Sequence, residues 1–294
     1  MLRLCGVALL ATLVAVACGG GSKAHTTHVA PAPAQAQAPP SPDEPLPTDA
    51  AGLAARLTQV GDELNSAIDA WRGQGNPSVG DAPDEVTLRS LYMQRAYRLL
   101  AKRPRLATST LRRVPARLRR HARESVAALR DLFRLTPPSH RKRFRTGPAE
   151  PAGRLLGYYR SAQRRFGIAW NVLASVNFVE TTFNRIRSSS SSGAQGPMQF
   201  LAGTWRMYGL GGDVHDPHDA VLGAANFLHR SGAPRSYRRA LYRYNPSPLY
   251  VDAVLRYARR MAADPRAFFG YYGWQVFVRT PSGERRITGP QPSG

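Results

Sequence analysis

The chain has 294 residues and a net charge of +22, and this length suits one main domain with an additional helical portion. Both cysteines, Cys5 and Cys18, lie near the start, which excludes disulfides and cysteine-bound metals from the folded body. The positive charge is concentrated in residues 91–150, which hold 17 Lys and Arg against 3 Asp and Glu.

The first residues are typical of a secretion signal of the lipoprotein type. Residues 6–17 form an apolar run of about a dozen residues, which is too short for a comfortable membrane span. Small residues precede Cys18 and glycines follow it, an arrangement that resembles a bacterial lipobox. We expect removal of residues 1–17 and lipid attachment at Cys18, which would leave an extracytoplasmic protein anchored to the bacterial cell membrane. Secretion without a lipid is the alternative.

Residues 18–48 are rich in Pro, Ala and Gly and predict a disordered linker, which would reach on the order of 90 Å if fully extended. A basic helical region is expected at residues 49–148. Apolar residues spaced by three and four predict helices near 53–71, 88–99 and 118–132, the second capped by Asp84.

The excess of arginine in residues 91–145 suits a polyanionic partner. The secretion signal argues against nucleic acid and leaves anionic lipid or an anionic polymer of the cell wall as the candidate partner. The alternative is a solvated, arginine-rich helix face with no partner.

The chemistry is concentrated in residues 149–262. Leu173, Val176 and Glu180 share one face of a predicted helix. Apolar surroundings disfavour the charged form of a carboxyl group and raise its pKa, as a general acid near neutral pH requires. The alternative is an ordinary ion pair at the end of a helix.

A glycine-rich turn follows this helix. Gly193 and Gly196 permit sharp turns, and Gln199 offers both a donor and an acceptor to a sugar hydroxyl or acetamido group. Trp205 adds a flat apolar ring of the kind that stacks on a sugar. The alternative is a structural turn that leads into a buried helix.

Four titratable residues lie on the next loop, namely His215, Asp216, His218 and Asp219. Their spacing matches no established set of metal ligands, so we expect neither a metal nor a cofactor. We expect Asp219 to cap the following helix instead.

The end of the chain changes character. A last helix of the catalytic region is predicted at residues 250–261. In the tail, residues 263–294, apolar and other residues alternate from Trp274 to Val278, which predicts a β-hairpin with its turn at residues 281–284.

Several short motifs occur in one order along residues 150–262. They are Glu180-Thr-Thr-Phe183, Gly193-Ala-Gln-Gly-Pro-Met-Gln-Phe200, Asp216-Pro217, Ala224-Ala225-x-x-Leu228 and Tyr244-Asn245. Together they resemble the soluble lytic transglycosylase superfamily of peptidoglycan enzymes. The residues of the motifs are most similar to those of its membrane-bound B-type branch. The chain departs from the pattern at Thr181, where many relatives have serine, and at Ala202-Gly203, where that branch often has Pro-Ser.

The resemblance implies a mainly α, lysozyme-like catalytic domain, with helices before it and a small hairpin after it. It also implies that the substrate is the glycan strand of peptidoglycan, cleaved between MurNAc and GlcNAc by Glu180 with formation of 1,6-anhydro-MurNAc ends. The substrate-binding residues that it implies are Thr181, Met198, Gln199, Tyr244, Asn245 and Tyr250.

Two other functions are compatible with these residues. The first is a lysozyme-like hydrolase, in which Asp213 or another loop carboxylate positions a water molecule. The second is a wall-binding lipoprotein without activity.

Overall fold

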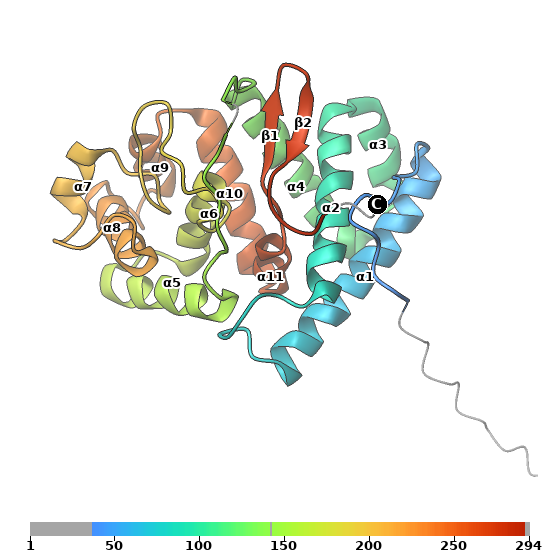
Figure 1. The fold of residues 1–294 in the computed structure, drawn as a ribbon, viewed down its shortest axis with the longest axis horizontal. Helices are drawn as coiled ribbons and strands as arrows, with labels where there is room; N and C mark the ends of the chain where they lie inside the picture. Colours follow the sequence, from blue (N-terminus) through green and yellow to red (C-terminus); the bar gives the residue numbers. More distant parts are fainter. Residues whose placement is uncertain (1–36, 142, 292–294) are drawn as a thin grey trace, which may run out of the picture. The chain divides into compact units, whose positions relative to one another are not determined.

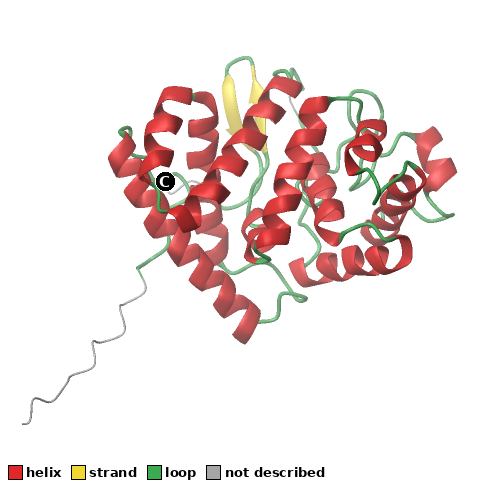
Figure 2. Cartoon of the chain, turned by 180° about the vertical axis from the view of Figure 1, so that it is seen from behind, coloured by secondary structure: helices red, strands yellow, loops and turns green. Residues whose placement is uncertain are grey.

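Helices make up most of the described chain, as predicted, and one small antiparallel hairpin follows them (Figures 1 and 2). The computed structural model describes residues 37–141 and 143–291. The predicted signal peptide, Cys18 and the linker up to residue 36 lie outside the described residues. Contacts divide the chain into residues 1–37 and 38–294, and the second unit is described below. None of the helices described there has the length and apolar character needed to cross a membrane.

Four helices form the N-terminal part of this unit. They are α1 (Ala50–Gln74), α2 (Asp84–Lys102), α3 (Pro104–Arg113) and α4 (Ala116–Leu135). Asp49 begins α1, because its carboxylate accepts hydrogen bonds from the N–H groups of Ala51 and Gly52 at 3.0 and 2.9 Å. Helix α1 packs against α2 and α3 along its buried stripe of apolar side chains.

Three predictions for this part need correction. Pro83 occupies the cap position of α2 and Asp84 is the first helical residue, so the predicted cap at Asp84 is wrong. Helix α3 was not predicted, because this short helix buries only three side chains and leaves no long apolar stripe. Residues 37–48 were assigned to the disordered linker, but Glu44 pairs with Arg56 at 2.8 Å and its carbonyl accepts from Arg95, which holds this segment on the helices.

The second part of the unit contains seven helices. They are α5 (Ala152–Phe166), α6 (Trp170–Thr181), α7 (Ala202–Tyr208), α8 (Pro217–Arg230), α9 (Tyr237–Tyr244), α10 (Pro248–Ala263) and α11 (Arg266–Tyr272). Helix α6 lies among α5, α8, α10 and α11, and every side chain from Val172 to Phe178 is buried. A helix that is apolar on all sides belongs in a core, so the residues at its end are drawn inward as well.

Two further predictions in this part are corrected. The carboxylate of Asp216 accepts from the N–H of Asp219 and begins α8, so Asp216 is the cap and Asp219 lies in the first turn. The tail was predicted as a hairpin alone, but it begins with helix α11. Six residues of this helix are buried, so it has no polar face, and its sequence does not show the alternation of apolar and polar residues by which a helix is predicted.

Helix α10 joins the two parts, because one side packs on α4 and another on α6 (Figure 1). Aromatic rings continue the contact: Phe178 of α6 lies 4.9 Å from Tyr257 of α10 and 5.3 Å from Tyr271 of α11, between ring centroids. The hydroxyl of Tyr271 in turn lies 2.9 Å from that of Ser125 on α4. Residues 49–148 and 149–262 therefore share one core, and a boundary between them stays a prediction.

The hairpin consists of β1 (Phe277–Thr280) and β2 (Gly283–Arg286). Phe277 pairs with Arg286 and Thr280 with Gly283, so only two residues connect the strands and the turn is shorter than predicted. Trp274, Gln275 and Val276 are buried before β1 begins. Their alternation indicated a strand, but their burial comes from packing in the core.

A buried arginine attaches this hairpin to α2. Arg98 donates to the carboxylate of Glu284 at 2.8 Å, and its guanidinium lies 4.6 Å from the ring of Phe277 and 4.9 Å from that of Phe133. Burial alone would raise the pKa of Glu284, but Arg98 and Lys102 outweigh it and hold the pKa below its usual range. A two-stranded hairpin is marginal alone, so this ion pair positions it.

Replacing Glu284 with Gln should therefore destabilise the protein by about 3 kcal/mol, because the Arg98 charge would stay buried without a carboxylate. Urea unfolding at neutral pH measures the difference. The control is Asp252→Asn, which breaks an exposed pair with Arg238 and should cost less than about 1 kcal/mol. Equal costs for the two variants would contradict the proposed role of the buried pair.

Candidate active site

Glu180 is the penultimate residue of α6, at the point where the chain leaves the core. Thr182, Phe183 and Asn184 follow with positive φ angles of 51°, 59° and 66°, in the left-handed region that side chains other than glycine rarely adopt. Such residues cost about 1–3 kcal/mol each and persist where the surrounding structure imposes them. Here the ring of Phe183 is fully buried against Phe178, and the N–H of Asn184 donates to Thr181 at 2.9 Å.

The glycine-rich turn is fixed to α6 by a buried polar network. The hydroxyl of Thr181 and the side-chain amide of Asn177 both donate to the carbonyl of Pro197, at 2.7 and 2.9 Å. Tyr159 of α5 donates to the other end of that amide at 2.6 Å. Thr181 is fully buried, so its described bonds hold the turn in place beside Glu180.

Within this turn, Gly196 has a φ of 73°, and a Cβ atom there would lie 1.9 Å from the carbonyl oxygen of Val214. No residue with a side chain fits this close approach. Gln199 has a φ of 50° and donates to the carbonyl of Gly196 at 3.0 Å, which aligns its half-buried amide. The side chain of Met198 is buried, and its carbonyl oxygen accepts from the hydroxyl of Tyr244 at 2.5 Å.

Two tyrosines cover the other side of Glu180. Tyr250 near the start of α10 is buried and donates its hydroxyl to Glu180 Oε1 at 2.7 Å. Its ring lies parallel to that of Tyr244, with centroids 6.5 Å apart. Asn245 follows α9 and is half-buried, and its described hydrogen bonds are made by its backbone. The structure thus gathers Glu180, Met198, Tyr244 and Tyr250 through direct contacts.

The carboxyl group of Glu180 is half-buried among these groups. Burial raises its pKa to about 7, although the hydrogen bond from Tyr250 acts in the opposite direction. Both protonation states are therefore populated near neutral pH. A carboxyl of this kind can give a proton to one atom and take one from another within a single reaction.

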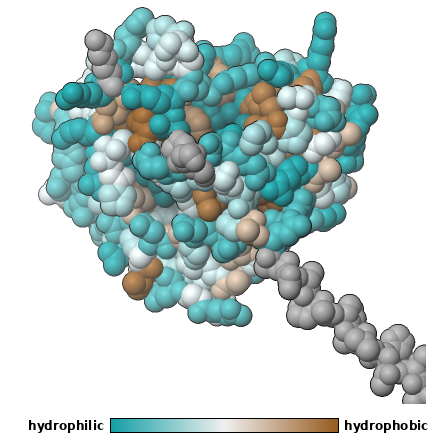
Figure 3. All heavy atoms as spheres, turned by 45° about the vertical axis from the view of Figure 1, so that its right-hand side comes forward, coloured by the Kyte–Doolittle hydropathy of each residue, from teal (hydrophilic) through white to brown (hydrophobic). Residues whose placement is uncertain are grey.

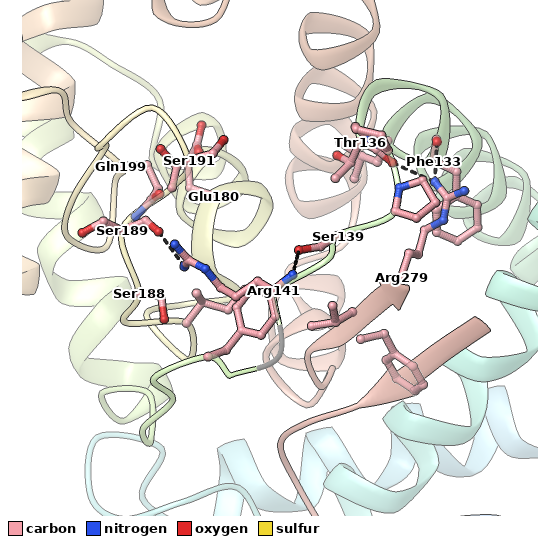
Figure 4. A pocket seen from close by; sticks show the side chains of 18 of the residues that line it. Phe133, Thr136, Ser139, Arg141, Glu180, Ser188, Ser189, Ser191, Gln199 and Arg279 are labelled. Carbon is pink, nitrogen blue, oxygen red and sulfur yellow. Dashed lines mark hydrogen bonds between the residues drawn. The ribbon is translucent and has the colours of Figure 1, made fainter. Parts of the chain in front are cut away.

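Glu180 lines a pocket of about 670 Å³, which we call the Glu180 pocket (Figure 4). Gln199 and the serine loop, residues 188–191, form one side of it. The other side consists of the end of α4, the segment after it and strand β1. Among the described residues that line this pocket, Glu180 is the single carboxylate, and Arg98, Arg141 and Arg279 are the cations.

Sequence reasoning missed this second side. Phe133, Arg141 and Arg279 come from segments far from Glu180 in the chain, and no short motif includes them. Two features of the sequence belong to this side of the pocket, the cluster of arginines and the predicted hairpin. The sequence did not indicate that either of them lies near Glu180.

Trp205 has a different environment from the one predicted. It is half-buried, its ring lies 5.2 Å from that of Phe200, and a Cβ atom at Gly223 would lie 2.6 Å from it. Its ring therefore packs α7 against α8. Trp205 is not among the described residues that line the Glu180 pocket.

One group of described residues has the geometry to hold a metal ion. Ligand atoms of Asp216, His218 and Asp219 lie within 4.8 Å of one another. However, Asp216 accepts from the N–H of Asp219 at 2.9 Å, and Asp219 accepts from the N–H of Asp213 at 3.0 Å. The Asp216 carboxylate thus stabilises the start of α8, and the Asp219 carboxylate holds the loop before it. None of these three residues is among the described residues that line the Glu180 pocket.

The arginines of residues 91–145 are partly used within the fold. Arg119 donates to the carbonyl of Val114 at 2.8 Å, and Arg130 donates to that of Ala101 at 3.3 Å. On the face drawn in Figure 3, hydrophilic side chains predominate and hydrophobic ones form small separate groups. Binding of an anionic wall polymer by this stretch stays a prediction.

Comparison with known proteins gives one distant relative. The chain is 26% identical over 122 residues to "Membrane-bound lytic murein transglycosylase F" of Thiobacillus denitrificans. The match covers 39% of this chain and 26% of that protein, so it spans about a quarter of the relative's length. No protein-family model matches the chain. No solved structure matches it either.

The raised pKa predicts a dependence of stability on pH. Because Glu180 is harder to ionise in the folded state, the wild type should lose stability as the pH rises from about 4.5 through about 7. Glu180→Gln has no charge to bury, so its stability relative to the wild type should rise by up to about 3 kcal/mol across this window. Denaturant unfolding at pH 4 and pH 8 measures the change.

Glu150→Gln is the control for loss of one carboxylate, since Glu150 pairs with Arg154 on the surface. If the difference in stability between Glu180→Gln and the wild type stayed constant from pH 4 to pH 8, the burial of the Glu180 carboxyl group would be refuted.

Proposed function

We propose that this protein is a lytic transglycosylase that cleaves the glycan strands of peptidoglycan at the β-1,4 bond between MurNAc and GlcNAc. The observation that carries the proposal is the half-buried carboxyl of Glu180, with a pKa of about 7 and a bond from Tyr250, at the side of an open pocket. The ordered motifs of residues 150–262 and the distant relative named as a murein transglycosylase support the choice of substrate.

In the first step, protonated Glu180 gives its proton to the oxygen between the two sugars. The bond from this oxygen to C1 of MurNAc breaks, and GlcNAc leaves with a new hydroxyl group at C4. Positive charge develops at C1 and is shared with the ring oxygen, assisted by the sugar's own acetamido group. Tyr250 can hold the resulting carboxylate by the hydrogen bond that it already donates.

In the second step, the carboxylate of Glu180 takes the proton of the C6 hydroxyl group of the same MurNAc. The C6 oxygen attacks C1 and closes a 1,6-anhydro ring, which restores protonated Glu180. No water is consumed, and one carboxyl group serves both steps because the substrate supplies the nucleophile. A pKa near the working pH suits this double role.

The neighbouring residues would hold the sugar. Gln199 faces the pocket with an amide that suits an acetamido or hydroxyl group. Tyr244 fixes the Met198 carbonyl next to Gln199. Half-buried Asn245 follows Tyr244 in the chain, but neither of these two residues is among the described residues that line the Glu180 pocket, so their contact with the sugar is a proposal from the motif alone. We assign Thr181 a positioning role, because its hydroxyl is buried in the network around Pro197.

The alternatives receive less support. A hydrolase needs a group that positions water near Glu180. Asp213, the residue suggested for this, is exposed, accepts from the N–H of His215 at 2.9 Å and is not among the described residues of the Glu180 pocket. A wall-binding protein without activity does not need a carboxyl group whose pKa is raised to about 7.

We also propose that the protein is extracytoplasmic and attached to the cell membrane by a lipid on Cys18. The support comes from the small residues before Cys18 and the glycines after it, and from the term "Membrane-bound" in the relative's name. The anchor would keep the catalytic site close to the wall that it cleaves.

Digestion of purified sacculi tests the reaction. Mass spectrometry of the wild-type products should find muramyl ends one water lighter than reducing ends. Glu180→Gln should lower the rate about a thousandfold, because it removes the acid and the base together. Glu150→Gln should cleave normally. Reducing ends would identify a hydrolase, and unchanged cleavage by Glu180→Gln would overturn the assignment of the site.

The lipid anchor is tested in bacterial cells that express the full chain. Cys18→Ser should abolish labelling of the protein by radioactive palmitate and remove it from the membrane fraction. Cys5→Ser provides a matched control, since it changes the other cysteine and should keep the label. Palmitate labelling of Cys18→Ser would contradict the proposed attachment.

A further inference from the structure

We propose that the Glu180 pocket binds the anionic peptide stem of the muramyl residue, so that the protein prefers peptide-bearing glycan strands to bare ones. This inference rests on the proposed function and extends it to the choice among peptidoglycan substrates. It assigns a role to the basic region and to the hairpin, both of which lie outside the residues that carry the family motifs.

One wall of the pocket is built by a segment that we call the strap, residues 136–141 and 143–146, which runs from the hairpin to the serine loop. The N–H of Ser139 donates to the carbonyl of Arg279 on β1 at 2.8 Å. Arg141 donates to the carbonyl of Ser189 at 2.8 Å, and the N–H of Arg145 donates to the hydroxyl of Ser188 at 2.7 Å. The strap is therefore bound to the hairpin at one end and to the serine loop at the other.

The charges of the pocket favour an anion. Arg98 is already paired with Glu284. Arg141 and Arg279 instead bind backbone carbonyls: Arg141 that of Ser189, and Arg279 those of Phe133 and Thr136 at 2.5 and 2.8 Å. Carbonyl oxygens orient a guanidinium group without neutralising its charge. A carboxylate is the ligand that such oriented guanidinium groups prefer, along with phosphate.

The residues that line the Glu180 pocket favour a ligand with carboxylates over one with phosphates. Aromatic rings of Phe133, Phe144 and Phe277 lie among the serines and arginines of the wall. A peptide stem combines free carboxylates with methyl groups and an apolar backbone, which suits this mixture. A polymer of phosphate and polyol offers little to an aromatic surface. The volume of about 670 Å³ lies in the range of pockets that bind small organic ligands.

The position of the pocket fits the substrate. The stem is attached at C3 of MurNAc, the same sugar whose C1 would lie at Glu180. Figure 4 shows Glu180, Gln199 and the Arg141 guanidinium on one side of the pocket, with Arg279 and Phe133 on the other. A stem that leaves the sugar at Glu180 would meet Arg141 first and then extend toward the hairpin.

The test compares Arg141→Gln with Arg143→Gln. Both remove one exposed positive charge from the strap. Arg141 lines the Glu180 pocket, whereas Arg143 lines only an adjoining depression that Arg141 also reaches. The substrates are glycan strands that carry peptide stems and the same strands after an amidase has removed the stems. The measured quantity is the ratio of kcat/KM for the two substrates, at low and at high salt.

The wild type should favour the peptide-bearing strands, and Arg141→Gln should reduce this ratio about fivefold, as expected for one partly solvated ion pair. Arg143→Gln should keep the ratio, and Arg141→Lys should restore part of it. High salt should weaken the preference. An equal ratio in the wild type and Arg141→Gln would overturn the inference. Absence of cleavage of either substrate by the wild type would instead refute the proposed function.

A binding measurement separates the pocket from catalysis. Titration of Glu180→Gln with a soluble N-acetylmuramyl tripeptide, followed by NMR, should give a dissociation constant about fivefold lower than for the double variant Glu180→Gln, Arg141→Gln. Equal affinity of the two proteins would count against the pocket as the site for the stem, whichever reaction the protein catalyses.

Discussion

The site depends on the burial of one carboxyl group beside one tyrosine hydroxyl. Glu180 is the penultimate residue of a helix that lies in the core, and the hydroxyl of Tyr250, near the start of α10, donates to its carboxyl group at 2.7 Å. Burial raises the pKa of Glu180 more than this bond lowers it, and the result is about 7. A more exposed carboxyl would stay charged at neutral pH and could not supply a proton. Among the described residues, Tyr250 is the group that donates a hydrogen bond to this carboxyl and can hold it once the proton has left.

Helix α10 carries much of this arrangement. Its first turn provides Tyr250, while its length packs on α6 and α4 together. The N-terminal helices therefore support the site through the core that they share with α10. The hairpin depends on them as well, because Arg98 of α2 binds Glu284 and lies against Phe277. Segments that lie outside the motif-bearing residues thus support the core and form one wall of the pocket.

The sequence predicted the elements whose signal is local. Three-four spacing indicated α1, α4 and the Glu180 helix, and the apolar face around Glu180 indicated a raised pKa. The short helices α3 and α11 were missed, because one buries few residues and the other buries almost all of its own. The contact of Tyr250 with Glu180 joins residues 70 positions apart, so periodicity could not indicate it. The same holds for Arg141 and Arg279, which meet in one pocket through tertiary packing alone.

The most direct measurement of the central claim is an NMR titration of the Glu180 carboxyl carbon. The spectrum of Glu180→Gln would identify the signal by its absence. We predict a midpoint near pH 7, where an exposed glutamate has ionised completely. A midpoint near 4.5 would mean that this carboxyl is charged under working conditions, and it would contradict the account of Glu180 as an acid and a base in turn.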